Sequence, residues 1–220
     1  MQGVQTGSHT NPRVPEVYLE HLRGMLERDA RCMIGLVGPP GAGKSTLAEA
    51  LRASFATIAQ VVPMDGYHLA NVELARLGRA ARKGAPDTFD AFGYVALLQR
   101  LRRQVAGEII YAPEFRREIE EPIAGAIPVF AQTQLIIAEG NYLLLDDGVW
   151  ADISGLLDEI WYVDIDHSVR TERLIGRHER FGRSRQQAEA WVCNTDEPNA
   201  RLIERTKARA TRLFRWDEVG

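Results

Sequence analysis

A glycine-rich segment carries the clearest chemical signal in this sequence. Residues 38–45 read GPPGAGKS and match the phosphate-loop pattern G-x-x-x-x-G-K-[ST]. In such a loop the glycines let backbone N–H groups surround a polyphosphate, the lysine reaches the β- and γ-phosphates, and the hydroxyl can bind Mg²⁺. The predicted nucleotide contacts are Gly38, Pro39, Pro40, Gly41, Ala42, Gly43, Lys44, Ser45 and Thr46. The segment predicts a nucleotide-binding protein, with Ser45 as a metal ligand.

Two acidic residues follow predicted strands, at the sheet edge where open α/β folds bind ligands. Asp65 could accept the proton of a substrate hydroxyl, hold Mg²⁺ through water, or simply belong to an Asp-Gly turn. Glu139 occupies the place of the second carboxylate that phosphate-loop enzymes use for Mg²⁺, although a solvated acid at a strand end is the alternative.

Four arginines recur at helical spacing near the C-terminal third of the chain, at Arg170, Arg173, Arg177 and Arg180. Spacings of three, four and three place them on one helix face. Such a face could clamp the phosphoryl group during transfer, in the manner of a closing lid. The alternative is a solvated face whose arginines pair with Glu172 and Glu179.

Polar and aromatic residues between the two acids are suited to contact a small hydroxylated substrate. The candidates are Tyr67, His68, Asp87, Asp90, Tyr111, Glu114, Phe115 and Arg116. The four tryptophans, Trp150, Trp161, Trp191 and Trp216, are interpreted as core residues.

Short apolar runs alternate with helical periodicity, which is typical of a three-layer α/β domain with a mainly parallel sheet. The expected strands are 33–37, 60–64, 135–138, 159–163 and 211–216, and residues 109–111 and 122–123 could form a hairpin. Helices are expected at 16–28, 45–55, 92–105 and 168–180, after a capping box at Ser184 and Gln187, and from Pro198 to about residue 210. Pro63 favours an edge or the end of its strand.

The composition excludes several classes of protein. The chain has 220 residues with 45% hydrophobic and 26% charged, as expected of a globular domain, and its net charge of −3 disfavours a nucleic-acid binder. Two distant cysteines encode neither a disulfide framework nor a zinc site, and no apolar run approaches membrane-spanning length. The N-K-x-D motif of GTPase switches and the L-S-G-G-Q segment of transporter ATPases are absent. We expect a soluble, cytoplasmic protein without nucleic-acid or membrane partners.

The motifs together resemble the phosphate-loop kinases of the uridine kinase, phosphoribulokinase and bacterial pantothenate kinase group. The landmarks, in the family's order, are 38–45, MDGYH at 64–68, GAPDTFD at 84–90, IYAPEF at 110–115 and IAEGNY at 137–142. Further segments resemble bacterial fructose transport system kinases, several of which are described as fructokinases: RH at 177–178, FGR at 181–183, WV at 191–192 and DEPNA at 196–200.

This resemblance implies a five-stranded sheet with a small helical lid, ATP and Mg²⁺ as cofactors, and phosphoryl transfer to a hydroxyl of a small metabolite, such as fructose. It implies that Asp65 is the base and that Arg173 and Arg177 meet the phosphates. Asn199 is then expected near the adenine, and Asn141 and Glu139 near the substrate. Residues 1–13 would be a flexible tail before one kinase domain, 14–220, with a substrate-binding excursion at about 66–125 and a lid at about 170–190.

Two departures from the family pattern bear on the acceptor. Gly66 stands where uridine kinases usually have Ser, and residues 114–117 read EFRR in place of their Tyr-Asp/Ser-His stretch. Both departures disfavour uridine. A pantothenate- or nucleoside-type kinase, and a nucleotide-binding regulator of a transport system without kinase activity, remain the alternatives, as does either a monomer or a homodimer.

Overall fold

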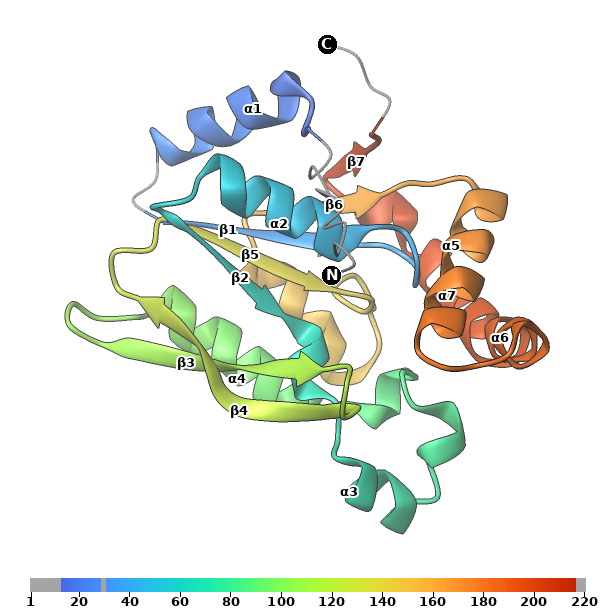
Figure 1. The fold of residues 1–220 in the computed structure, drawn as a ribbon. Helices are drawn as coiled ribbons and strands as arrows, with labels where there is room; N and C mark the ends of the chain where they lie inside the picture. Colours follow the sequence, from blue (N-terminus) through green and yellow to red (C-terminus); the bar gives the residue numbers. More distant parts are fainter. Residues whose placement is uncertain (1–12, 29–30, 217–220) are drawn as a thin grey trace, which may run out of the picture.

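Five parallel strands form the centre of the molecule, in the spatial order β2–β5–β1–β6–β7 (Figure 1). The structure is a computed structural model that describes residues 13–28 and 31–216, so the predicted tail lies almost entirely outside the described residues. The strands are β1 (Cys32–Val37), β2 (Ala59–Pro63), β5 (Leu135–Gly140), β6 (Glu159–Val163) and β7 (Arg212–Phe214). The predicted parallel α/β sheet is confirmed, and Pro63 is the last residue of an edge strand, where its missing N–H costs no ladder bond.

Alternating side chains of the strands build two separate cores, one on each face of the sheet. Cys32, Ile34 and Leu36 of β1 pack with α1 (Glu16–Leu26) and α2 (Lys44–Ser54). Met33 and Val37 pack on the opposite face with α4 (Ala91–Arg102) and the 3₁₀ segment Gly148–Leu156. Because β1 and β5 are covered on both faces, every residue in them is buried, and the predicted three layers are confirmed (Figure 1).

The stretch between the two acidic residues divides into two pieces around a core helix. The first, here called the insert, is residues 64–90, with α3 (Asn71–Arg76) and three short 3₁₀ turns. The second is an antiparallel hairpin of β3 (Ile109–Arg116) and β4 (Glu121–Phe130), which confirms and lengthens the predicted one. The expected substrate-binding excursion, about 66–125, thus spans both pieces together with α4, which packs on the sheet between them.

Helix α4 is shorter than its sequence pattern suggests. It ends at Arg102, before the predicted limit, and Val105 is 65% exposed instead of sharing the buried face of Val95, Leu98 and Leu101. Gln104 explains the early end in part, since its amide donates to the carbonyls of Glu108 and Val129 and so ties this turn to the hairpin.

The C-terminal third supplies a helical lid beside the sheet (Figure 1). It consists of α5 (His167–Arg180), α6 (Arg185–Trp191), a π-helical turn (Val192–Asp196) and α7 (Glu197–Glu204). The capping box is confirmed at Ser184 and Gln187. The last helix was predicted too long, since after Glu204 the chain turns into a 3₁₀ segment, Lys207–Arg209. Among the helices of the described residues, none is long and apolar enough to cross a membrane.

Gly66 lies where the hairpin touches the end of β2. A Cβ atom at this position would come within 2.3 Å of the carbonyl oxygen of Pro113 in β3. Pro113 falls at the register shift between Ala112 and Glu114, which brings its backbone toward the turn that carries Asp65. Glycine is therefore required for the hairpin to approach Asp65.

We predict that Gly66→Ala lowers the free energy of unfolding by about 1–3 kcal/mol, because overpacking against a backbone carbonyl forces the hairpin away. Thermal unfolding measures the effect. Gly24→Ala is the matched control, since nothing lies within 4 Å of a Cβ at that helical position and alanine is favoured in helices. An unchanged Tm for Gly66→Ala would contradict the close approach.

Candidate active site

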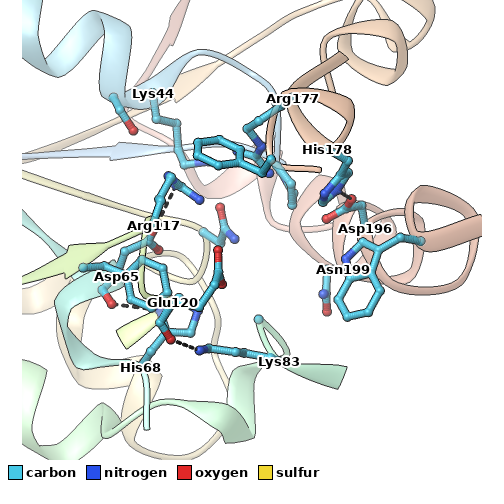
Figure 2. Close-up of a pocket in the computed structure, with 18 of the residues that line it drawn as sticks. Lys44, Asp65, His68, Lys83, Arg117, Glu120, Arg177, His178, Asp196 and Asn199 are labelled. Atoms are coloured by element: carbon cyan, nitrogen blue, oxygen red, sulfur yellow. Dashed lines mark hydrogen bonds and ion pairs between the residues drawn. The ribbon is translucent and has the colours of Figure 1, made fainter. Parts of the chain in front are cut away.

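A cavity of about 610 Å³ lies at the carboxyl ends of β1, β2 and β5. The phosphate loop forms one wall and the lid a second, while the insert and the hairpin form the wall opposite (Figure 2). This is the edge of an open parallel sheet at which ligands bind. The sequence predicted the loop and both carboxylates at this edge, and the structure places them together.

The phosphate loop joins β1 to α2 and presents the positive end of that helix to the cavity. Gly43 has φ +91°, a left-handed conformation that favours glycine, and directly precedes the first turn of α2. Lys44 is buried and its Nζ donates to the carbonyls of Gly38 (2.8 Å) and Pro39 (3.2 Å). Burial lowers the Lys44 pKa to about 8, against the opposing effect of the Glu139 carboxylate.

Glu139 is a buried carboxylate beside the loop. It is the fifth residue of β5, opposite Pro63 of β2 and Leu36 of β1, so the strand register fixes it next to the loop. The Ser45 hydroxyl donates to its two oxygens at 3.1 and 3.2 Å. Burial and, after it, the Asp65 charge raise the Glu139 pKa to about 7, while Lys44 and Ser45 act in the opposite direction.

The oxygens of Ser45 and Glu139 fit the preference of Mg²⁺ for hard oxygen ligands. A hydroxyl and a carboxylate that already touch are close enough to share one cation, and the remaining ligands of Mg²⁺ in such sites are phosphate oxygens and water. The predicted metal role of both residues is consistent with this geometry.

Asp65 lies in the 3₁₀ turn after β2, with its side chain 31% exposed to the cavity. One carboxylate oxygen is 3.4 Å from Nη2 of Arg117. Its backbone carbonyl, 2.8 Å from His68 Nδ1, can only accept, so the neutral His68 ring carries its proton on Nδ1. Burial lowers the His68 pKa and favours this neutral form.

The lid presents two arginines, Arg177 and Arg183, to the cavity beside a chain of polar groups. Arg177 lines the cavity, and burial followed by the charge of Arg117 lowers its pKa. Arg183 donates to His178 Nδ1 (2.7 Å), so the Nε2 proton of His178 is donated to Asp196 (2.9 Å). Asp196, the last residue of the π-helical turn, and Asn199, in the first turn of α7, both line the cavity on the lid side (Figure 2).

The four lid arginines do not form one clamp, which corrects the sequence interpretation. Arg170 is 1% exposed and supports the loop from beneath: it forms an ion pair with Glu197 and donates to the Pro40 carbonyl at 3.4 Å. Arg180 is exposed and donates to the backbone of its own helix. Arg173 approaches the loop, with Nη1 3.8 Å from a Cβ built at Gly43. Arg177 alone of the four lines the cavity.

The predicted substrate-binding residues divide into two groups. His68, Phe115, Glu139 and Asn141 line the cavity. Tyr67 packs against Tyr94 of α4 instead, and burial raises its pKa to about 12. The others lie at the surface away from the cavity: Asp87 pairs with Arg79 and Arg82, Arg116 pairs with Glu114, and Tyr111 is 56% exposed.

Several cavity residues were not singled out from the sequence, or were assigned to the core. Trp191 was interpreted as core, but it lines the cavity with Arg183 stacked 4.0 Å from its ring. Trp150 and Trp161 are buried as expected. Lys83, Arg117 and Glu120 also line the cavity. For Arg117 and Glu120 the sequence offered one signal: both are charged and both lie between the two arms of the expected hairpin.

The fold and site define a P-loop kinase, with a phosphate loop between β1 and α2, a carboxylate at the end of the neighbouring strand and an arginine-bearing lid. A model of the Phosphoribulokinase / Uridine kinase family matches residues 33–215, and the chain belongs to this family of ATP-dependent kinases.

Individual relatives agree with this assignment. The chain is 36% identical over 191 residues to a "putative uridine kinase" of Schizosaccharomyces pombe, covering 83% of this chain and 76% of that one. It is 36% identical over 167 residues to an "ATP-dependent kinase-like protein" of Aspergillus versicolor, covering 71% and 97%. The crystal structure of a "putative fructose transport system kinase" from Silicibacter sp. TM1040 superposes with a TM-score of 0.81 at 36% identity, covering 89% and 98%.

The lowered pKa of Lys44 predicts how nucleotide affinity depends on pH. Bound phosphates stabilise the ammonium form, so binding takes up a proton wherever the free protein has lost it. We expect the affinity for ATP, measured by calorimetry without divalent metal, to fall by up to about tenfold per pH unit above about pH 8, where the terminal phosphate of ATP is already fully ionised.

Lys44→Arg is the control, because arginine keeps its charge throughout this range. Its affinity should show no fall above pH 8. A wild-type affinity that stays constant to about pH 9.5 would contradict the role of Lys44 as the titrating phosphate ligand.

Proposed function

We propose that this protein is an ATP-dependent small-molecule kinase that transfers the γ-phosphate to a hydroxyl group of a small metabolite, with a sugar or sugar derivative as the substrate class. The observation that carries the proposal is the position of Asp65, an accessible carboxylate across the cavity from the phosphate loop (Figure 2). A carboxylate in this position can accept the proton of a hydroxyl group on a second bound molecule.

The loop and the lid bind and orient the nucleotide. Lys44 and the loop amides hold the phosphates, and Arg177 enters from the lid to meet the charge on the transferring group. Ser45 and Glu139 would hold Mg²⁺, which when bound neutralises charge on the β- and γ-phosphates. Arg170 keeps the loop in place from beneath through Pro40. Positioning and electrostatics thus supply most of the catalysis, as in other phosphoryl transfers.

Asp65 receives the proton of the acceptor hydroxyl as its oxygen bonds to the γ-phosphorus and the bond from that phosphorus to the β–γ bridging oxygen of ATP breaks. His68 orients the turn of Asp65 through its backbone carbonyl. Phe115 and Phe89 give the acceptor end of the cavity an aromatic wall, and Asn141 adds an amide that can bind hydroxyl groups. This mixture of apolar faces and hydrogen-bonding groups suits a small polyhydroxylated compound.

Asp65→Asn should lower kcat by about 10²–10⁴-fold while the KM for ATP changes by less than about twofold, because the amide cannot accept the proton but leaves the loop intact. Release of ADP is measured against fructose and other sugars, glycerate, pantothenate, ribulose 5-phosphate and nucleosides.

Lys44→Ala provides the blank for contaminating activity. Stimulation by one compound, lost in both variants, supports the kinase. A kcat of Asp65→Asn equal to the wild type would remove Asp65 from the mechanism, and ATP binding with no stimulation by any compound would favour a nucleotide-binding regulator.

A further inference from the structure

Two cations from different elements meet at the acceptor end of the cavity. Lys83 comes from the insert and its Nζ lies 5.1 Å from the centre of the Phe115 ring. Arg117 comes from the hairpin and its Cζ lies 6.0 Å from the same centre. Both line the cavity, on the wall opposite Lys44 and Arg177 (Figure 2). Lys83 is separate from the cations that face the nucleotide phosphates, whereas the charge of Arg117 reaches Lys44 and Arg177 and, in addition to burial, lowers the pKa of each.

Neither cation has a strong anionic partner within the protein. Lys83 donates to the Asn71 side-chain oxygen at 2.7 Å and to the Glu120 carbonyl, which are both neutral. In the described part of the chain no carboxylate oxygen lies within ion-pairing distance of its ammonium group. Arg117 makes a single contact of 3.4 Å with Asp65, between side chains that are 40% and 31% exposed. Such an exposed pair is weak and can exchange for a better ligand.

The contact between Arg117 and Asp65 occupies the carboxylate that the proposed mechanism needs for the acceptor hydroxyl. Arg117 therefore has to turn away from Asp65 when the acceptor binds. Moreover, once Asp65 is protonated Arg117 loses the carboxylate with which it is paired, whereas the charges of Glu120 and Glu121 still act on Lys83. An anion on the bound molecule would give Arg117 another partner. Carboxylate and phosphate both match the planar fork of arginine.

The positions of these cations are fixed by contacts between the insert and the hairpin tip. The Asn71 backbone N–H donates to both carboxylate oxygens of Glu121, at 3.0 and 3.1 Å, and its side chain donates to the Glu120 carbonyl at 3.1 Å. Glu120 has φ +53°, a left-handed conformation that is uncommon outside glycine and that turns the tip toward the insert. The two segments thus hold Lys83 and Arg117 around one side of the cavity.

We propose that the acceptor is an anionic hydroxy compound, whose carboxylate or phosphate group is bound by Arg117 and Lys83 while its hydroxyl faces Asp65. This inference rests on the proposed kinase function and narrows its substrate class from sugars in general to sugar acids, sugar phosphates and similar compounds. Arg117 is then a specificity-determining residue that leaves Asp65 when the anion binds. Glu120 and Asn141 remain to bind the other hydroxyl groups.

The test begins with binding to protein saturated with Mg²⁺ and a non-hydrolysable ATP analogue, so that the phosphate loop is filled. Matched compounds differ in one group: glycerol, glycerate and glycerol 3-phosphate, and glucose, gluconate and glucose 6-phosphate. We expect an anionic member to bind, measured by thermal shift and calorimetry, and its neutral partner to bind at least about tenfold more weakly. Whether carboxylates or phosphates bind distinguishes the two anion classes.

Arg117→Gln and Lys83→Gln should each weaken binding of the anionic compound by about tenfold or more and leave the affinity for the ATP analogue unchanged. Arg76→Gln is the matched control, because it removes the same charge from the insert at an exposed side chain paired with Glu73, outside the cavity. In the kinetic assay, Arg117→Gln should raise the KM for the anionic acceptor and leave the KM for ATP unchanged.

Three results would overturn the inference: no anionic compound binds the nucleotide-loaded wild type, the neutral partners bind equally well, or Arg117→Gln binds like Arg76→Gln. A different result would contradict the kinase proposal while leaving the anion site in place. Anion binding that depends on Arg117, without ADP release from any compound, would support the anion site and contradict phosphoryl transfer.

Discussion

The active site depends on the burial of Lys44 and Glu139 around Ser45 at one edge of the sheet. Each charge is costly to bury alone, and their opposite effects on each other's pKa show that each offsets part of the cost of the other. Strand register fixes Glu139, and the start of α2 fixes Lys44 and Ser45. The phosphates of a bound nucleotide would complement the charge of Lys44, and Mg²⁺ would complement that of Glu139. Binding of the nucleotide would therefore offset the cost of burying these two charges.

The remaining walls are built around this buried pair. The lid reaches it through Arg170, whose ion pair with Glu197 joins α5 to α7 beneath Pro40. The hairpin packs against the turn that carries Asp65. The contact is at Gly66, where the backbone of Pro113 leaves no room for a side chain. Each wall therefore carries its own functional group to the cavity, Arg177 from the lid and Arg117 from the hairpin, on a segment whose position is fixed by packing elsewhere. Changes in the lid and in the hairpin would therefore alter different walls of the cavity.

Sequence reasoning succeeded where function depends on local pattern. The phosphate loop is contiguous, and Asp65 and Glu139 follow apolar runs whose strand character is evident, so their meeting follows from the rule that parallel strands end at one edge. Sequence reasoning failed where contacts with residues distant in the sequence determine what a side chain does. Arg170 and Arg177 lie about 10 Å apart along one helix face, yet one contacts the underside of the loop and the other the cavity. Lys83 and Arg117 meet because Asn71 contacts a hairpin tip 50 residues away, which no local pattern reveals.

The central claim is that the γ-phosphate moves to an organic hydroxyl in a step that needs Asp65. The most direct measurement follows the isotope in γ-labelled ATP incubated with the protein and a mixture of small hydroxylated metabolites, and identifies the labelled product by mass spectrometry. We predict a labelled organic phosphate ester with the wild type and none with Asp65→Asn. Label recovered only in ATP or in inorganic phosphate, with the wild type shown to bind ATP, would contradict the account.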